Sequence, residues 1–264
     1  DLGPRRRGRQ QGEERDGGGA HGRHLTRAAA RRQSNAHYRG TRMNKITDLG
    51  PAFGNLKKLR YLNLAGNSIT ELPAGFTNLT ELTDLNLSLN KLTTYPIAVT
   101  KLVQLKKLDL GLNSINTIPA DAGLLVNLEY LNLDNNFFNK KESKISKLIP
   151  ELCNLKKLKV LSVKDNVVDV LPECIGELSD LEKLDLRDNL IGAFPASFTL
   201  LKNLKWLDLK ANDFESLPDG FQNLNSLKAL NLSMNLKMNY YYHWFHYHDY
   251  RHSVSSKITC GNYG

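Results

Sequence analysis

The central part of this 264-residue chain, residues 43–235, contains no histidine. The seven histidines lie outside it, at His21, His24, His37, His243, His246, His248 and His252. Histidine is the side chain whose ordinary pKa lies near neutral pH, so its absence removes the usual group for acid–base catalysis and metal binding. The nucleotide-binding motif G-x-x-x-x-G-K-[ST] is also absent. We therefore expect no enzymatic activity, cofactor or metal site in residues 43–235.

Cysteine is scarce, and long apolar runs are missing. The chain has three cysteines, Cys153, Cys174 and Cys260, with no C-x-x-C pair. This odd and scattered set predicts neither a disulfide framework nor a zinc site, and we expect Cys153 and Cys174 to be buried filler. No apolar run approaches the ~18 residues that a membrane-spanning helix needs. The composition favours a cytoplasmic protein without a membrane span.

The formal charge of +9 is distributed unevenly. Residues 1–42 hold eleven arginines, no lysine and four acidic residues, a net charge of +7, whereas residues 43–235 are neutral overall. We expect residues 1–42 to be an Arg/Gly-rich leader that is either disordered or not native protein. The alternative is an arm that touches nucleic acid or anionic lipid. Because aromatic residues for base stacking are not interleaved with the arginines, we expect no nucleic-acid partner.

Residues 236–264 add a charge of +2 and are rich in aromatic residues and histidine. We expect this tail to hold no repeat, and to pack over the end of the folded region or remain disordered. A metal site built from His243, His246 and His248 is a further alternative. It is disfavoured because no carboxylate or cysteine accompanies these histidines at ligand spacing.

Asparagine recurs through the central region at a fixed spacing. The positions are Asn44, Asn67, Asn90, Asn113, Asn136, Asn166, Asn189, Asn212 and Asn235, with intervals of 23 residues except for one of 30. Apolar residues keep constant offsets around each one, as in Leu59-x-x-Leu62-x-Leu64-x-x-Asn67-x-Ile69-x-x-Leu72-Pro73. A period of this length indicates stacked copies of one structural unit.

Each part of the repeat predicts a local structure. The L-x-x-L-x-L segment alternates apolar and polar residues, which indicates a short strand, and one strand per repeat predicts a parallel sheet. The amide of the following asparagine can satisfy backbone groups where the chain turns off the strand. The prolines fix φ, so the return path should begin extended and end in a short helical or 3-10 turn. Since one unit cannot bury its apolar face alone, we expect a solenoid.

The pattern L-x-x-L-x-L-x-x-N-x-[IL]-x-x-L-P resembles the leucine-rich-repeat family, and within it the intracellular Ras-group class. The resemblance covers Asn44 to Asn235. It implies an α/β right-handed solenoid, or horseshoe, of about eight repeats, with a parallel sheet on the concave face and short helical, 3-10 or extended segments on the convex face. It further implies a monomeric scaffold whose protein partner is a small GTPase of the Ras type or an adaptor of a cell-adhesion complex. The rival interpretation is the recognition fragment of a larger receptor, kinase or ligase.

The residues between the buried leucines of each strand should form columns on the concave face. Lys164, Arg187 and Lys210 make a basic strip there, and Trp206 lies at the same end; Trp and Arg are enriched at binding hot spots. The predicted partner-binding residues are Val160, Lys164, Lys183, Asp185, Arg187, Trp206, Asp208 and Lys210. The alternative is a solvated face whose charges balance. The predicted structural ladder comprises Asn67, Asn90, Asn113, Asn136, Asn166, Asn189, Asn212 and Asn235.

The lengthened repeat is a second candidate binding region. Residues 137–147 contain Lys140, Lys141, Lys144 and Lys147 against Glu142. Insertions in repeat proteins emerge as loops on one face and often bind partners, although a merely solvated loop is an equal alternative.

Overall fold

A computed structural model of the chain describes residues 44–136 and 145–235, together with the backbone of residues 258–259. These residues form one open parallel sheet in which each strand pairs with the next along the chain. The strands are β1 (Tyr61–Asn63), β2 (Asp84–Asn86), β3 (Lys107–Asp109), β4 (Tyr130–Asn132), β5 (Val160–Ser162), β6 (Lys183–Asp185), β7 (Trp206–Asp208), β8 (Ala229–Asn231) and β9 (Ile258–Thr259). Paired residues are repeat equivalents, such as Leu62 with Leu85. The predicted solenoid is confirmed, and we call each repeat a coil, numbered by its strand.

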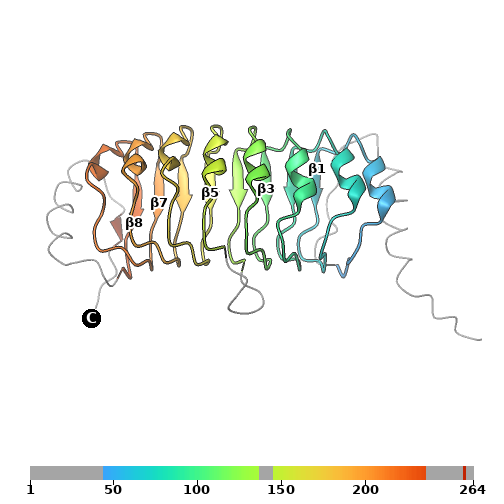
Figure 1. Ribbon diagram of the computed structural model, residues 1–264, viewed down its shortest axis with the longest axis horizontal. Helices are drawn as coiled ribbons and strands as arrows, with labels where there is room; N and C mark the ends of the chain where they lie inside the picture. Colours follow the sequence, from blue (N-terminus) through green and yellow to red (C-terminus); the bar gives the residue numbers. More distant parts are fainter. Residues whose placement is uncertain (1–43, 137–144, 236–257, 260–264) are drawn as a thin grey trace, which may run out of the picture.

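Short 3-10 helices cover the face opposite the strands, and Figure 1 shows them in front of the sheet along its whole length. They are η1 (Pro51–Asn55), η2 (Ala74–Asn78), η3 (Ile97–Lys101), η4 (Ala120–Leu124), η5 (Pro150–Asn154), η6 (Ile175–Glu177), η7 (Ala196–Leu200) and η8 (Phe221–Asn223). Pro73, Pro96, Pro119 and Pro195 precede four of them with extended backbone. The predicted return path, extended and then briefly helical, is confirmed.

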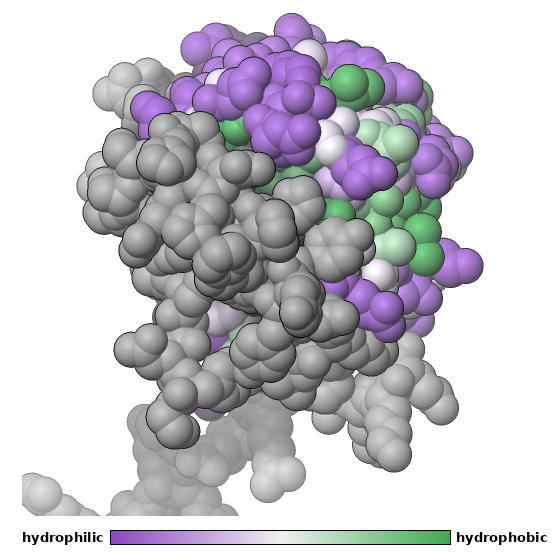
Figure 2. Space-filling view, turned by 90° about the vertical axis from the view of Figure 1, so that its left-hand side faces the viewer, coloured by the Kyte–Doolittle hydropathy of each residue, from purple (hydrophilic) through white to green (hydrophobic). Residues whose placement is uncertain are grey.

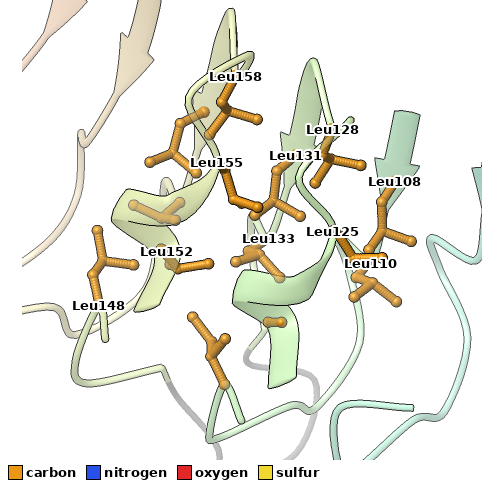
Figure 3. Close-up of a cluster of buried hydrophobic side chains, with 14 of the residues drawn as sticks. Leu108, Leu110, Leu125, Leu128, Leu131, Leu133, Leu148, Leu152, Leu155 and Leu158 are labelled. Carbon is orange, nitrogen blue, oxygen red and sulfur yellow. The ribbon is translucent and has the colours of Figure 1, made fainter. Parts of the chain in front are cut away.

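The core lies between the strands and the 3-10 helices. The central leucine of each strand from β1 to β8 is at most 4% exposed; these are Leu62, Leu85, Leu108, Leu131, Leu161, Leu184, Leu207 and Leu230. Figure 3 shows Leu108 and Leu131 from β3 and β4 packing with Leu125 and Leu152 from the opposite side. Because every coil contributes the same positions, burial of this apolar surface requires neighbouring coils on both sides.

The ladder asparagines are buried and hydrogen-bond to two coils at once. The Asn90 Nδ2 group donates to the carbonyl oxygens of Leu64 and Leu87, each at 2.9 Å, and its Oδ1 accepts from Ile69 N–H at 3.0 Å. The next ladder residue, Asn113, donates to Leu87 O and Leu110 O. Consecutive asparagines thus share one carbonyl, so the ladder is continuous, as the repeat predicted. Asn166 Oδ1 has no partner among the described residues, although Ile145, whose carbonyl accepts from Val167 N–H, occupies the place that Ile69 has relative to Asn90.

The residue before each ladder asparagine adopts left-handed backbone. In coil 1 it is Gly66, but in the later coils it is a residue with a side chain, with φ between 50° and 62°: Leu89, Leu112, Asn135, Asp165, Asp188, Ala211 and Met234. This conformation costs roughly 1–2 kcal/mol for an L-residue. Its recurrence shows that the buried amide and the packed leucines impose the turn against the local preference.

Cys153 and Cys174 form a disulfide with a Cα–Cα distance of 6.0 Å, so the expectation that they would be unpaired filler is wrong. Cys153 lies in η5 and Cys174 directly precedes η6, on the neighbouring coil. Their separation of 21 residues is close to the 23-residue period, which places them side by side on the convex face. The near match between this separation and the repeat period is the feature of the sequence that could have predicted the disulfide.

The ends of the solenoid and the insertion are described only in part. Residues 1–42, and most of residues 236–264 and of the insertion, lie outside the described residues, but β9 pairs with β8. Lys147 is exposed, while Lys140, Lys141 and Lys144 are not described. Figure 2, which views the molecule from the β8 end, shows a mostly hydrophilic surface with a hydrophobic stretch within it. None of the helices in the described part is long and apolar enough to span a membrane.

Replacing Asn113 by Ala should lower the free energy of unfolding by roughly 2–3 kcal/mol. The change leaves the buried Leu92 N–H without its acceptor and removes one donor from each of two carbonyls. Asn116→Ala, an exposed asparagine of the same coil, is the matched control and should have little effect. Urea denaturation of both variants is the measurement, and equal stabilities would contradict the ladder's role.

Replacing Cys174 by Ser should destabilise the chain by about 3 kcal/mol without reductant, because the bond closes a loop of 21 residues in the unfolded state. With dithiothreitol present, wild type and variant should unfold at the same urea concentration. Cys260→Ser, a cysteine outside the described residues, provides the control. A wild-type midpoint that does not move on reduction would show that the bond does not form.

Candidate binding surface

The sheet face carries three parallel columns of side chains, because equivalent residues of neighbouring coils are paired in register. The first column is Tyr61, Asp84, Lys107, Tyr130, Val160, Lys183, Trp206 and Ala229. The central column is Asn63, Asn86, Asp109, Asn132, Ser162, Asp185, Asp208 and Asn231. The third column is Ala65, Ser88, Gly111, Asp134, Lys164, Arg187, Lys210 and Ser233. We refer to these columns together as the sheet face.

The central column serves the backbone of the turn that follows each strand. Asp109 Oδ1 accepts from Gly111 N–H at 3.0 Å, and Asp208 Oδ1 accepts from Lys210 N–H at 3.0 Å. The same bond, from a side-chain oxygen to the N–H two residues later, occurs at Asn63, Asn86, Asn132, Asp185 and Asn231. Short residues with a carbonyl or carboxylate oxygen are therefore required here by the fold, and the turn occupies one side-chain oxygen of each.

Ser162 is the exception in the central column, and a residue of the preceding coil replaces its function. Asp134 Oδ1, from the third column, accepts from Ser162 Oγ–H at 2.6 Å and from Lys164 N–H at 2.8 Å. Asp134 thus supplies the acceptor that Asp or Asn supplies in the other coils. Sequence reasoning missed this bond, although Ser162 is the one residue of the column that is neither Asp nor Asn.

The predicted basic strip is brought together on three neighbouring coils. Lys164, Arg187 and Lys210 are all partly exposed. Arg187 Nη2 lies 3.4 Å from Asp185 Oδ2, while its Nε is buried without a hydrogen-bond partner among the described residues. Asp185 and Asp208 are each only 4% exposed. The carboxylates therefore lie at the floor of the sheet face and the cations lie above them.

Trp206 is half-buried. The Lys183 Nζ atom lies 4.3 Å from the centroid of the Trp206 ring, a cation–π contact between first-column residues of β6 and β7. Such a contact stabilises by about 0.5–1 kcal/mol at exposed sites. Val160 is the neighbour of Lys183 on the other side, in β5. The exposed Lys183 therefore lies between an apolar side chain and an aromatic one.

Burial raises the pKa of three carboxylates on the sheet face. It raises the pKa of Asp185 to about 6, although the Arg187 guanidinium and the Arg187 N–H act in the opposite direction. Burial also raises the pKa of Asp109 and of Asp134, in the latter case against hydrogen bonds from Ser162 and Lys164. The negative charge beneath the basic strip consequently weakens as the pH falls toward 6.

A family profile described as a leucine-rich repeat region matches residues 49–167 and 149–240. The chain belongs to the leucine-rich repeat family. Comparison with curated protein sequences gives no significant match. Leucine-rich repeat proteins generally mediate protein–protein interaction, so the sheet face is to be considered as a binding surface.

Solved structures of leucine-rich repeat proteins are similar to this chain. A leucine-rich repeat protein of Leptospira interrogans has 29% identity and a TM-score of 0.75, with 83% of this chain and 53% of that chain covered. The ectodomain of the Arabidopsis receptor kinase HAESA, in complex with an N-terminally extended IDA peptide hormone, has 30% identity and a TM-score of 0.58, with 67% of this chain and 30% of that chain covered. A chain of the octameric complex of Latrophilin 3, Unc5D and FLRT2 has 27% identity and a TM-score of 0.67, with 84% and 68% covered. This chain thus spans about half the length of the Leptospira protein.

Replacing Asp134 by Ala should destabilise the repeat domain by about 1–2 kcal/mol, because Lys164 N–H and the Ser162 hydroxyl lose their acceptor. Ser162→Asn provides a local acceptor of the kind present in the other coils. In that background, Asp134→Ala should cost much less. A double-mutant cycle, with stabilities measured by urea denaturation, gives the coupling between positions 134 and 162. If the two changes have additive effects on stability, Asp134 does not replace the acceptor that residue 162 lacks.

Proposed function

We propose that this leucine-rich repeat protein is a monomeric, non-enzymatic scaffold that binds a protein partner through the sheet face over β5, β6 and β7. The observation that carries the proposal is the arrangement of the predicted site residues. Val160, Lys183 and Trp206 form one row across these strands, and Lys164, Arg187 and Lys210 form a parallel row beside it. Trp and Arg on a rigid surface are the residue types most enriched at binding hot spots.

The absence of catalytic function is part of the proposal and rests on the sequence. Residues 43–235 contain no histidine, and the carboxylates of the central column are engaged by backbone N–H groups. A carboxylate that accepts such bonds holds the turn in place and is poorly placed to transfer protons to a substrate. Binding is the function that these residues support best.

The cellular role that we propose follows from the resemblance to the intracellular Ras-group class. The stretch Asn90–Pro96 and the lengthened repeat resemble features of Ras suppressor protein, although the insertion differs in length and this chain has an additional regular repeat before it. We therefore propose a cytoplasmic role, with a Ras-type GTPase or a cell-adhesion adaptor as the partner. A proline recurs at the same place in six coils, after leucine in three of them and after tyrosine, isoleucine or phenylalanine in the others, and this recurrence supports the class.

A second candidate is the recognition module of a larger receptor, kinase or ligase. The Cys153–Cys174 disulfide favours it, because disulfides persist mainly in oxidising compartments. The similar HAESA structure is the ectodomain of a receptor kinase, and this chain covers 30% of it. Extending the open reading frame on both sides distinguishes the candidates, since a membrane span or a catalytic domain in the same frame would establish the second.

Replacing Trp206 by Ala should leave the fold intact and reduce recovery of the partner at least tenfold, as expected for a hot-spot residue. The measurement is quantitative capture from cell lysate on the immobilised full chain. Tyr61→Ala, an aromatic residue at the other end of the same column, is the matched control and should retain the partner. Recovery that is unchanged by Trp206→Ala would remove β5–β7 as the binding surface.

A further inference from the structure

The charges on the sheet face over β5–β7 are separated by depth. Asp185 and Asp208 are 4% exposed, and each directs one oxygen to a backbone N–H of its own turn. Asp208 Oδ2 also accepts from Asn231 Nδ2 at 3.2 Å. The lysines above them are not engaged in this way, because neither Lys164 nor Lys210 forms an ion pair within the described residues. An approaching partner therefore meets positive charge first.

Arg187 lies at the centre of this positive charge. Its guanidinium is held by one contact of 3.4 Å to Asp185, its Nε has no partner among the described residues, and the side chain is 37% exposed. A guanidinium presents a planar set of donors that fits a carboxylate. Lys164 and Lys210 flank it at roughly 5 Å per strand, so the three cations repeat at a spacing that an extended chain can follow.

An apolar strip accompanies the cations. Val160 and Trp206 are half-buried, and they lie on either side of Lys183 in the first column. Lys183 covers one face of the Trp206 ring and would be drawn toward a carboxylate placed nearby. A ligand that contains both acidic and apolar side chains would therefore match two parallel rows of the surface.

The side chains over β5–β7 favour a protein occupant over other polyanions. The cations lie beside the row that holds Val160 and Trp206, whose apolar surface anionic headgroups alone would leave unused. Recognition of single-stranded nucleic acid uses successive aromatic platforms, and this region offers one, Trp206, which Lys183 already covers.

We infer that the partner of this protein presents an acidic segment with at least one apolar or aromatic side chain, and that this segment lies across β5–β7. Its carboxylates contact Arg187, Lys164 and Lys210, and its apolar side chain packs on Trp206, with Val160 on the other side of Lys183. The inference rests on the proposed function and names the chemistry of the partner. It requires binding to weaken with added salt, because the contacts are charged and partly exposed.

The test uses the full chain and short fluorescein-labelled peptides that differ only in charge. One peptide alternates glutamate with tyrosine, a second alternates lysine with tyrosine, and a third alternates glutamine with tyrosine. Anisotropy titrations should show binding of the glutamate peptide alone, weakening between about 50 and about 300 mM salt. Anionic phosphatidylserine vesicles and single-stranded RNA are titrated in parallel.

Two sets of variants locate the binding. The double variant Lys164→Glu with Lys210→Glu should weaken binding of the glutamate peptide roughly tenfold, since two attractive charge contacts at the surface become repulsive. Lys57→Glu with Lys58→Glu makes the same change of charge at exposed lysines away from the sheet face, and should have no effect. Arg187→Gln removes the central charge without reversing it, and supplies an independent measurement if the double variant is unstable.

The outcomes separate this inference from the proposed function. If the lysine peptide binds as tightly as the glutamate peptide or tighter, or if the glutamate peptide does not bind, the inference that the partner presents an acidic segment is wrong. Tighter binding of vesicles or RNA, lost in the same variants, would overturn a protein occupant. Loss of the captured partner on Trp206→Ala would still support the proposed function in either case, whereas unchanged capture would refute that function itself.

Discussion

The structure depends on one buried interaction, the hydrogen bonding of an asparagine amide to two neighbouring coils. From Asn90 to Asn235, each amide donates to a carbonyl of its own coil and to the equivalent carbonyl of the coil before it, and in most coils its oxygen accepts from an N–H on the return path, as in Asn90. These backbone groups turn inward off the strand, where water cannot reach them. An unpaired buried amide or carbonyl costs about 1–3 kcal/mol, so the amide makes the turn possible. The left-handed residue before each asparagine is the local cost of placing it there.

This constraint divides the sheet face into residues that build it and residues that are free to vary. The central column must carry a short acceptor, because the N–H two residues later lies at the end of the strand and needs one. Binding chemistry is therefore left to the first and third columns. In coils 5 to 7 these columns hold the cations and Trp206, while in coils 1 to 3 the third column holds only Ala65, Ser88 and Gly111.

Cross-coil contacts show how the fold tolerates departures from the repeat. Ser162 cannot reach the N–H of Lys164 as an aspartate would, and Asp134 takes over from the neighbouring coil. The disulfide between Cys153 and Cys174 joins the same two coils on the opposite face, because Cys153 follows β4 and Cys174 follows β5. Both contacts involve the lengthened repeat, where the spacing between ladder residues rises to 30. These two contacts add to the connections between coils that the asparagine ladder makes at every repeat.

The amino-acid sequence by itself determined the strands, the asparagine ladder, the extended start of the return path before the 3-10 turn, and the grouping of the basic strip. It could do so because period and alternation translate directly into which residues stack and which side they face. Only the tertiary structure decided the contacts between non-equivalent positions. The Asp134 bonds span 28 and 30 residues and the disulfide spans 21, so these contacts depend on the reach and direction of side chains across packed coils. The depth of Asp185 below Arg187, and the position of Lys183 over Trp206, were decided in the same way.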